Sequence, residues 1–168
     1  QLESERLIYL FRRNGQELEF VVRELWEELQ QSQFQPAGFE VNFGNAEGLP
    51  PIAISGETMN AILRGFVDRV DTWHRQGTDY YRVVDYKTGR KDFDYCDVFN
   101  GVGLQMLLYM FALRNSGEDL LGPNPVPVGV QYFPARAPYL PADCYLDPDE
   151  AEKLRCAEWK RKGLLLRD

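Results

Sequence analysis

The chain has 168 residues, of which 26 are acidic and 19 are basic, so its formal net charge is −7. Apolar residues make up 44% and charged residues 27%, which excludes a disordered chain, a collagen-like repeat and a disulfide scaffold. No apolar run approaches the ~20 residues that a membrane span needs, and the acidic balance argues against binding nucleic acid by bulk charge.

The first half of the chain combines one helical segment with several strands. Apolar residues recur at helical spacing over 1–30, and a breaker segment with Pro36 follows over 31–38. Strands are predicted over 39–43, 52–54, 61–73 and 80–86. The last two form a hairpin, because Gly77 between them suits a tight turn.

The second half returns to helices around one strand. We expect a polar turn over 87–97, a helix over 98–115 and a buried strand over 126–133. Asp147 and Pro148 suit the cap and first position of a last helix that reaches about residue 162. This order of elements predicts a mixed α/β domain.

Three cysteines, Cys96, Cys144 and Cys156, are widely separated along the chain. They form neither a C-x-x-C pair nor a zinc-ligand spacing, so we expect reduced thiols. Reduced thiols and charged first residues without a signal-peptide pattern favour a cytoplasmic protein.

The predicted hairpin brings two carboxylates face to face. A turn centred on residues 76–77 pairs Asp71 with Arg82 across the strands and places Asp68 directly opposite Asp85. Like charges in that position destabilise a sheet, and the valines beside them should be buried. Either one carboxyl stays protonated or a hard divalent cation lies between the two.

Lys87 lies on the same face, two residues beyond Asp85. Together with Asp68 it completes a group that suits metal-assisted hydrolysis of a phosphodiester. The two carboxylates and the backbone carbonyl of Tyr86 would hold the metal, while Lys87 orients the water or stabilises charge on the phosphate. The alternative is a surface hairpin with solvated acidic residues, which the buried flanks and the register disfavour.

Three ordered segments resemble the PD-(D/E)xK nuclease superfamily in its RecB-like branch. They are G-x-x-D at 65–68, D-Y-K-T-G at 85–89 and Q-x-x-x-Y at Gln105 and Tyr109. Within that branch the chain is most similar to the nuclease domain of AddB-type (RexB-type) subunits of bacterial ATP-dependent helicase–nucleases. The resemblance implies a restriction-endonuclease-like fold, with a central mixed sheet flanked by helices.

The resemblance also implies roles for individual residues. Asp68 and Asp85 are then metal ligands, and Lys87 is the catalytic lysine. Gln105 and Tyr109 support the site from one helical face, although ordinary polar positions on a core helix are the alternative.

Three further residues carry less weight. Glu40 matches an acidic position of the family and is a candidate contributor to the metal site. Arg90 and Lys91 are candidates for contact with DNA phosphates, and a solvated turn is the alternative.

The family implies magnesium-dependent exonucleolytic cleavage of DNA, with Mn²⁺ able to substitute. A helicase would feed the single-stranded end of a duplex into the site during double-strand break repair and recombination in the bacterial cytoplasm. The partners would be DNA and a second helicase–nuclease subunit, with no membrane. Two other functions stay open: a catalytically incomplete module for DNA guiding or subunit docking, and a free-standing RecB-like nuclease.

The chain departs from the family in its histidine and its cysteines. The family has an upstream histidine ligand and four cysteines for an iron–sulfur cluster, whereas His74 falls at the hairpin turn and the cysteines here do not match. We therefore expect an excised nuclease domain with weak or absent activity in isolation, the cluster belonging only to the full-length parent. Its parts would be a helical segment over 1–38, a catalytic core over 39–135 and a carboxy-terminal extension with a helix over 136–168.

Overall fold

The computed structural model describes residues 2–44, 48–89, 91–140 and 145–166. Its elements in chain order are α1 (Leu2–Gln31), β1 (Gln35–Phe43), β2 (Ile52–Ser55), β3 (Asn60–Leu63), β4 (Gly65–Arg75), β5 (Thr78–Lys87), α2 (Tyr95–Phe99), α3 (Gln105–Ser116), α4 (Glu118–Leu121), β6 (Val126–Pro134), α5 (Pro148–Glu158) and β7 (Lys162–Leu165). The predicted mixed α/β class is confirmed.

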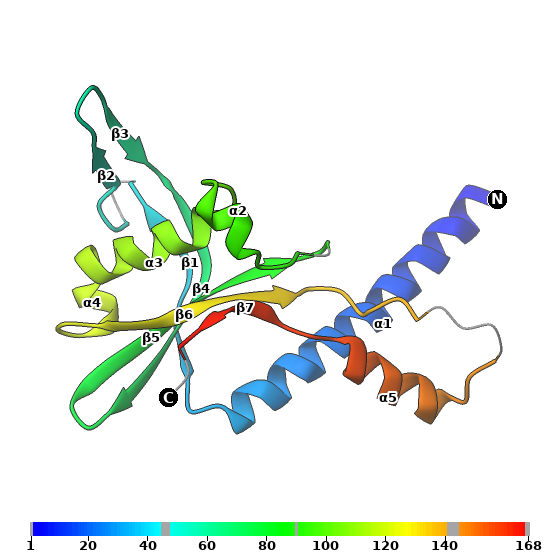
Figure 1. The fold of residues 1–168 in the computed structure, drawn as a ribbon. Coiled ribbons are helices and arrows are strands. Elements are labelled where there is room, and N and C mark those ends of the chain that lie inside the picture. Colours follow the sequence, from blue (N-terminus) through cyan, green and yellow to red (C-terminus); the bar gives the residue numbers. More distant parts are fainter. Residues whose placement is uncertain (1, 45–47, 90, 141–144, 167–168) are drawn as a thin grey trace.

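A five-stranded sheet in the order β1-β4-β5-β6-β7 organises the molecule (Figure 1). Strands β5 and β6 are parallel and the other neighbours are antiparallel, so the sheet is mixed. A parallel pair needs a long crossover, which α2, α3 and α4 supply between β5 and β6. Strands β2 and β3 form a separate two-stranded hairpin.

Two core clusters lie against the sheet. One joins α3 and α4 to the central strands, and its buried members include Val70, Val83, Met106, Tyr109, Leu113 and Leu121. The other joins α1 to β5, β6 and the segment before β7, through Phe20, Val21, Val84, Phe133 and Trp159. The sheet is therefore flanked by helices as predicted.

The first predicted helix is confirmed, and the strand after it starts earlier than predicted. The segment 35–38, predicted as a breaker, belongs to β1, because a proline is tolerated on an edge strand. The register shifts between Pro36 and Gly38, which marks a bulge there.

The long strand predicted over 61–73 is divided at Arg64. Strand β3 pairs with β2, whereas β4 pairs with β1 and β5, so the two pieces belong to different sheets. The hairpin turn itself is confirmed, since Gln76 and Gly77 both have positive φ values, 51° and 79°. Such a pair is typical of the tight turn that fits the twist of a hairpin.

The prediction of one helix over 98–115 is wrong in its bounds. The Asp94 side chain accepts a hydrogen bond from the Cys96 N–H at 2.7 Å and caps α2 inside the predicted polar turn. Gly101 and Gly103 then take positive φ values, 79° and 70°, and end that helical segment before α3 begins. Glycine adopts this backbone conformation without steric cost.

The carboxy-terminal helix begins where predicted but ends sooner. Asp147 caps α5 and Pro148 is its first residue, yet the helix stops at Glu158. The following residues form β7, an unpredicted strand that extends the sheet beside β6. Cys96 and Cys156 are free thiols as expected, and Cys144 lies outside the described residues.

Within the described ranges, no helix combines the length and the apolar character needed to cross a bilayer. Of the three tryptophans, Trp159 is buried and Trp73 contacts Tyr80, whereas Trp26 is 63% exposed on α1.

Candidate active site

The β4–β5 hairpin has the predicted register. Seven pairs run from Arg69 opposite Val84 to Arg75 opposite Thr78, and Asp71 lies opposite Arg82. Local turn geometry and favourable cross-strand pairs fix this alignment.

The ladder ends one pair before Asp68 and Asp85, which corrects the prediction that these residues are direct partners in the sheet. The Tyr86 N–H instead donates to Asp68 Oδ2 at 2.8 Å. Val67 and Val70 belong to the same core cluster although they are three residues apart, so the two-residue alternation of side chains is interrupted between them. The Asp68 carboxylate therefore replaces a strand carbonyl where β4 separates from β5.

Asp85 and Lys87 form an ion pair at the end of β5. The Lys87 Nζ lies 2.5 Å from Asp85 Oδ2, with side-chain exposures of 36% and 10%. The ammonium also lies 6.0 Å from the centroid of the Tyr132 ring, on the neighbouring strand β6. Lys87 is thus held between a carboxylate and an aromatic face, with part of its surface open to solvent.

Burial raises the pKa of Asp85, and this effect outweighs the lowering by Lys87; the negative charge of Asp68 raises it further. Burial opposes the charge on Lys87, yet the contact with Asp85 and the field of Asp68 leave the pKa of Lys87 raised. The site therefore has one carboxyl whose charge is disfavoured and one ammonium whose charge is favoured.

Tyr86 lies between these two residues with its side chain on the opposite face of the sheet. Its hydroxyl accepts a hydrogen bond from Arg69 Nη1 at 2.8 Å, and its ring packs edge-on against Phe133. Its N–H points toward β4, and the N–H and C=O of one strand residue point to the same neighbour. The Tyr86 carbonyl oxygen is therefore directed to the side of Asp68, as required of the predicted metal ligand.

Gln105 and Tyr109 lie on one face of α3, as their spacing predicted. Gln105 Nε2 donates to the Tyr109 hydroxyl at 2.9 Å. Tyr109 is buried and stacks on Phe43 of β1, with ring centroids 5.7 Å apart, whereas Gln105 is exposed at the start of the helix.

Glu40 lies on β1, between residues that pair with Arg69 and Val67, which places it beside Asp68 in the register. It is exposed and has a φ of 49°, a conformation that non-glycine residues rarely adopt. Lys91 is exposed, and Arg90 lies outside the described residues.

Sequence reasoning missed two neighbours of the site. Arg69 is fully buried and donates a hydrogen bond to the Tyr86 hydroxyl. The sequence predicted that Arg69 lies on a strand, but it did not predict the contact with Tyr86. Tyr132 lies opposite Asp85 in the parallel β5–β6 ladder. Nothing in the sequence fixes the register of two strands joined by a crossover, so this neighbour was not predictable.

A profile of the PD-(D/E)XK nuclease superfamily matches residues 3–162. The chain belongs to this superfamily. Three relatives are each named as a subunit of an ATP-dependent helicase/deoxyribonuclease. The protein of Symbiobacterium thermophilum is 37% identical over the whole chain, that of Clostridium novyi 41% over 84% of it, and that of Moorella thermoacetica 36% over 98%. The chain spans only 13–15% of the length of these relatives.

The donor set predicted for this chain consists of two carboxylates and one main-chain oxygen. Among the described residues, no three His, Cys, Asp or Glu side chains gather into a metal site. Mg²⁺ is commonly held by one or two carboxylates plus waters and substrate oxygens, so Asp68, Asp85 and the Tyr86 carbonyl fit such an ion. The buried carboxyl with a raised pKa is the group that a cation would compensate.

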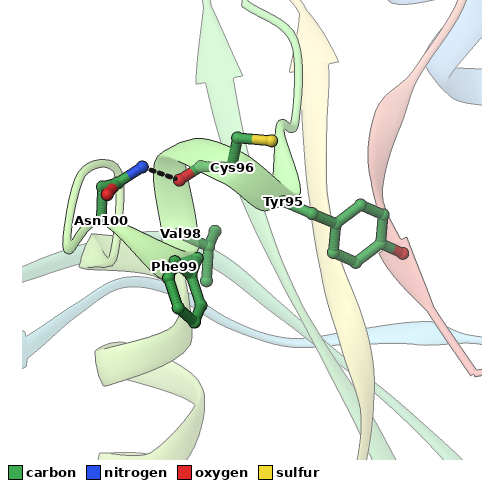
Figure 2. A pocket seen from close by; sticks show the side chains of 5 residues that line it. All are labelled: Tyr95, Cys96, Val98, Phe99 and Asn100. Carbon is green, nitrogen blue, oxygen red and sulfur yellow. Dashed lines mark hydrogen bonds between the residues drawn. The ribbon is translucent and has the colours of Figure 1, made fainter.

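An open hollow of about 500 Å³ lies beside α2 and contains none of the predicted site residues. Figure 2 shows Val98 and Phe99 pointing to one side of the helix, with Tyr95 pointing away from them and Asn100 bonded to the Cys96 carbonyl. Its lining offers no carboxylate or ammonium group, so the hollow lacks the side chains that the predicted chemistry needs.

Proposed function

We propose that this chain is the nuclease part of a helicase–nuclease subunit and hydrolyses DNA phosphodiester bonds with Mg²⁺, for which Mn²⁺ substitutes. The observation that carries the proposal is the Asp85–Lys87 ion pair at the end of β5, within the electrostatic reach of Asp68. A nuclease superfamily profile over 3–162 supports the same chemistry.

Asp68, Asp85 and the Tyr86 carbonyl hold the divalent ion. When bound there, the ion would polarise the phosphate and lower the pKa of a water molecule. Asp68 keeps its orientation through the Tyr86 N–H, and Asp85 keeps its own through Lys87. The two carboxylates thus present oxygen ligands from neighbouring strands.

Lys87 stabilises the negative charge that grows on the phosphate during hydrolysis, or orients the attacking water. Its raised pKa keeps it charged across the neutral range. Gln105 contacts the DNA beside the site from the exposed first turn of α3, and Tyr109 supports it. Glu40 contributes from β1, where it lies beside Asp68 in the register.

In the full-length subunit this activity is exonucleolytic, on a single strand delivered by a helicase. The names of the relatives support this setting, because each combines an ATP-dependent helicase with a deoxyribonuclease. We place the protein in the cytoplasm, where it processes double-strand breaks for recombination together with a second subunit. Lys91 contacts DNA phosphates near the site, and Arg90 is proposed from the sequence alone.

The test is Lys87→Ala in the full-length subunit, measured as magnesium-dependent cleavage of a single-stranded oligonucleotide. We expect a loss of about 10²- to 10³-fold in rate, typical of removing one group that stabilises transition-state charge. Lys153→Ala, at an exposed position of α5, is the matched control and should cleave like the unmodified protein. Equal rates for Lys87→Ala and the control would refute the proposal and favour a non-catalytic module.

A further inference from the structure

Gly65 lies against Tyr109, one of the two residues on α3 that are predicted to support the site. It is the first residue of β4, three positions before Asp68, and it faces Phe43 on β1. A Cβ placed on Gly65 would come within 3.0 Å of the Tyr109 hydroxyl and 3.2–3.3 Å of its ring carbons. The Tyr109 ring therefore lies on the bare backbone of Gly65 on one side and is stacked on Phe43, at an interplanar angle of 6°.

The backbone at Gly65 does not itself require glycine. Gly65 is not among the glycines with positive φ, so an alanine could adopt its conformation, and alanine suits a strand better than glycine does. What excludes a side chain is the hydroxyl of Tyr109. The ring is 5% exposed and cannot move into solvent without leaving its place on Phe43.

The same hydroxyl is the hydrogen-bond acceptor of Gln105. The 2.9 Å bond from Gln105 Nε2 orients an amide that otherwise lies exposed at the first position of α3. A shift of the hydroxyl by a few tenths of an ångström would lengthen or break that bond. Gly65, Tyr109 and Gln105 thus form one chain of contacts from β4 to the first residue of α3.

We propose that Gly65 is a positioning residue for Gln105. Its lack of a side chain lets the Tyr109 hydroxyl lie against β4, where that hydroxyl holds the Gln105 amide in one orientation. The inference rests on the proposed function only for its effect on DNA cleavage. The contact chain itself can be tested without any activity.

The structural arm uses the side-chain amide resonances of Gln105 in the ¹⁵N-labelled chain, assigned by their loss in Gln105→Glu. Gly65→Ala and Tyr109→Phe should both shift this amide pair, and to similar positions, because each removes the same bond. Phe66→Ala, the adjacent strand position with a 57% exposed side chain, is the matched control and should leave the pair in place. Unchanged resonances in Gly65→Ala would overturn the inference.

A double variant separates the specific clash from general damage to the fold. Tyr109→Phe removes the one atom that an alanine at position 65 would overlap, and leaves ring contacts of 3.2–3.3 Å that small adjustments can relieve. Gly65→Ala combined with Tyr109→Phe should therefore melt at the temperature of Tyr109→Phe alone, as coupled neighbours do. Additive losses in the double variant would overturn the inference.

The activity arm measures cleavage by the full-length subunit. Gly65→Ala, Tyr109→Phe and Gln105→Ala should each slow cleavage by roughly tenfold or more, since small misplacements near reacting groups are costly. Shifted amide resonances with unchanged cleavage would support the contact chain and contradict the proposed role of Gln105 in the reaction. A failure of the contact chain and a failure of the proposed function would therefore give different results.

Discussion

Asp85 has a charge that the metal-free fold disfavours. Its side chain is 10% exposed, and burial raises its pKa despite the ion pair with Lys87. A carboxyl placed at a cost to stability is typical of a functional position, because a structural ion pair would be expected to lower that pKa. Under the proposed function, a bound cation would offset this cost.

Asp85→Asn should therefore stabilise the metal-free protein at neutral pH. Because the pKa of Asp85 is raised in the folded state, its contribution favours folding fully below the unfolded pKa of 3.8 and is lost as pH rises through the folded value. Thermal melting in a chelator should give a higher Tm for Asp85→Asn at pH 7 than for the unmodified chain. The difference should shrink as the pH falls toward the ordinary carboxyl range.

Asp119→Asn, an exposed position of α4, is the control and should change the Tm little at any of these pH values. Saturating Mn²⁺ should then reverse the order, since a ligand at 100 times its Kd adds about 2.7 kcal/mol to the protein that binds it. A chelator-treated Asp85→Asn that melts below the unmodified chain at pH 7 would contradict the account of this residue.

The pairing of residues across the β4–β5 hairpin was the feature that the sequence predicted best. Asp71, Arg82 and the turn at residue 77 are close along the chain, so pairing rules alone gave the register. The environment of Asp68 could not be predicted, because it depends on β4 separating from β5 beyond Arg69 while β4 stays paired with β1, a strand distant along the chain. The sequence predicted that Asp68 and Asp85 share one site, but it did not predict the hydrogen bond from the Tyr86 N–H to Asp68.

Helix α1 has two apolar faces, of which one is buried and the other is exposed. Phe20 and Val21 are buried against the sheet, whereas Phe11, Leu18 and Val22 are exposed. In Figure 1 the amino-terminal part of the helix extends away from the sheet. Apolar spacing predicted the helix correctly, but spacing alone does not say which face the sheet covers.

Substitutions on the two faces should differ sharply in their effect on stability. Phe20→Ala should cost about 3–5 kcal/mol, because it empties a site that packs against Trp159 in the buried cluster that also contains Val84. Leu18→Ser, only two residues away, should change the free energy of unfolding by about 0.5 kcal/mol or less. Urea denaturation of the chain measures both, and equal losses would show that the exposed face also packs in solution.

A network of buried charges joins distant segments behind the site. Asp71 Oδ2 accepts from Arg82 Nε at 2.8 Å and from Arg69 Nη2 at 3.1 Å. Arg82 continues to Glu28 of α1, at 2.8 Å, and Glu28 also pairs with Arg161 just before β7. The network thus ties the first helix and the last strand to the hairpin that carries the predicted metal ligands.

Removing the central acid should destabilise the whole molecule. Asp71→Asn leaves two buried guanidinium groups without their shared carboxylate, and such a loss typically costs about 3–5 kcal/mol. Asp79→Asn removes the partner of His74, whose side chain is 67% exposed, and should cost at most about 1 kcal/mol. Chemical denaturation of the two variants tests the contrast; a similar small loss in both would mean that the network contributes little.

At the scale of the molecule, the sequence predicted the fold class and the strands β1, β4, β5 and β6 of the central sheet, but it missed the edge strand β7. Strands β4 and β5 are adjacent in sequence and were predicted as partners. Strand β7 was missed, because its four residues pair with β6 across a long separation and carry no alternation of their own. Tertiary pairing, not local preference, makes that segment a strand.

The most direct test of the central claim is calorimetric titration of the chain with Mn²⁺. We predict one bound ion per chain, and at least tenfold weaker binding by both Asp68→Asn and Asp85→Asn. Asp149→Asn, in the exposed first turn of α5, should bind like the unmodified chain. Absence of binding, or equal affinity in all four proteins, would contradict the claim that these two carboxylates form a metal site.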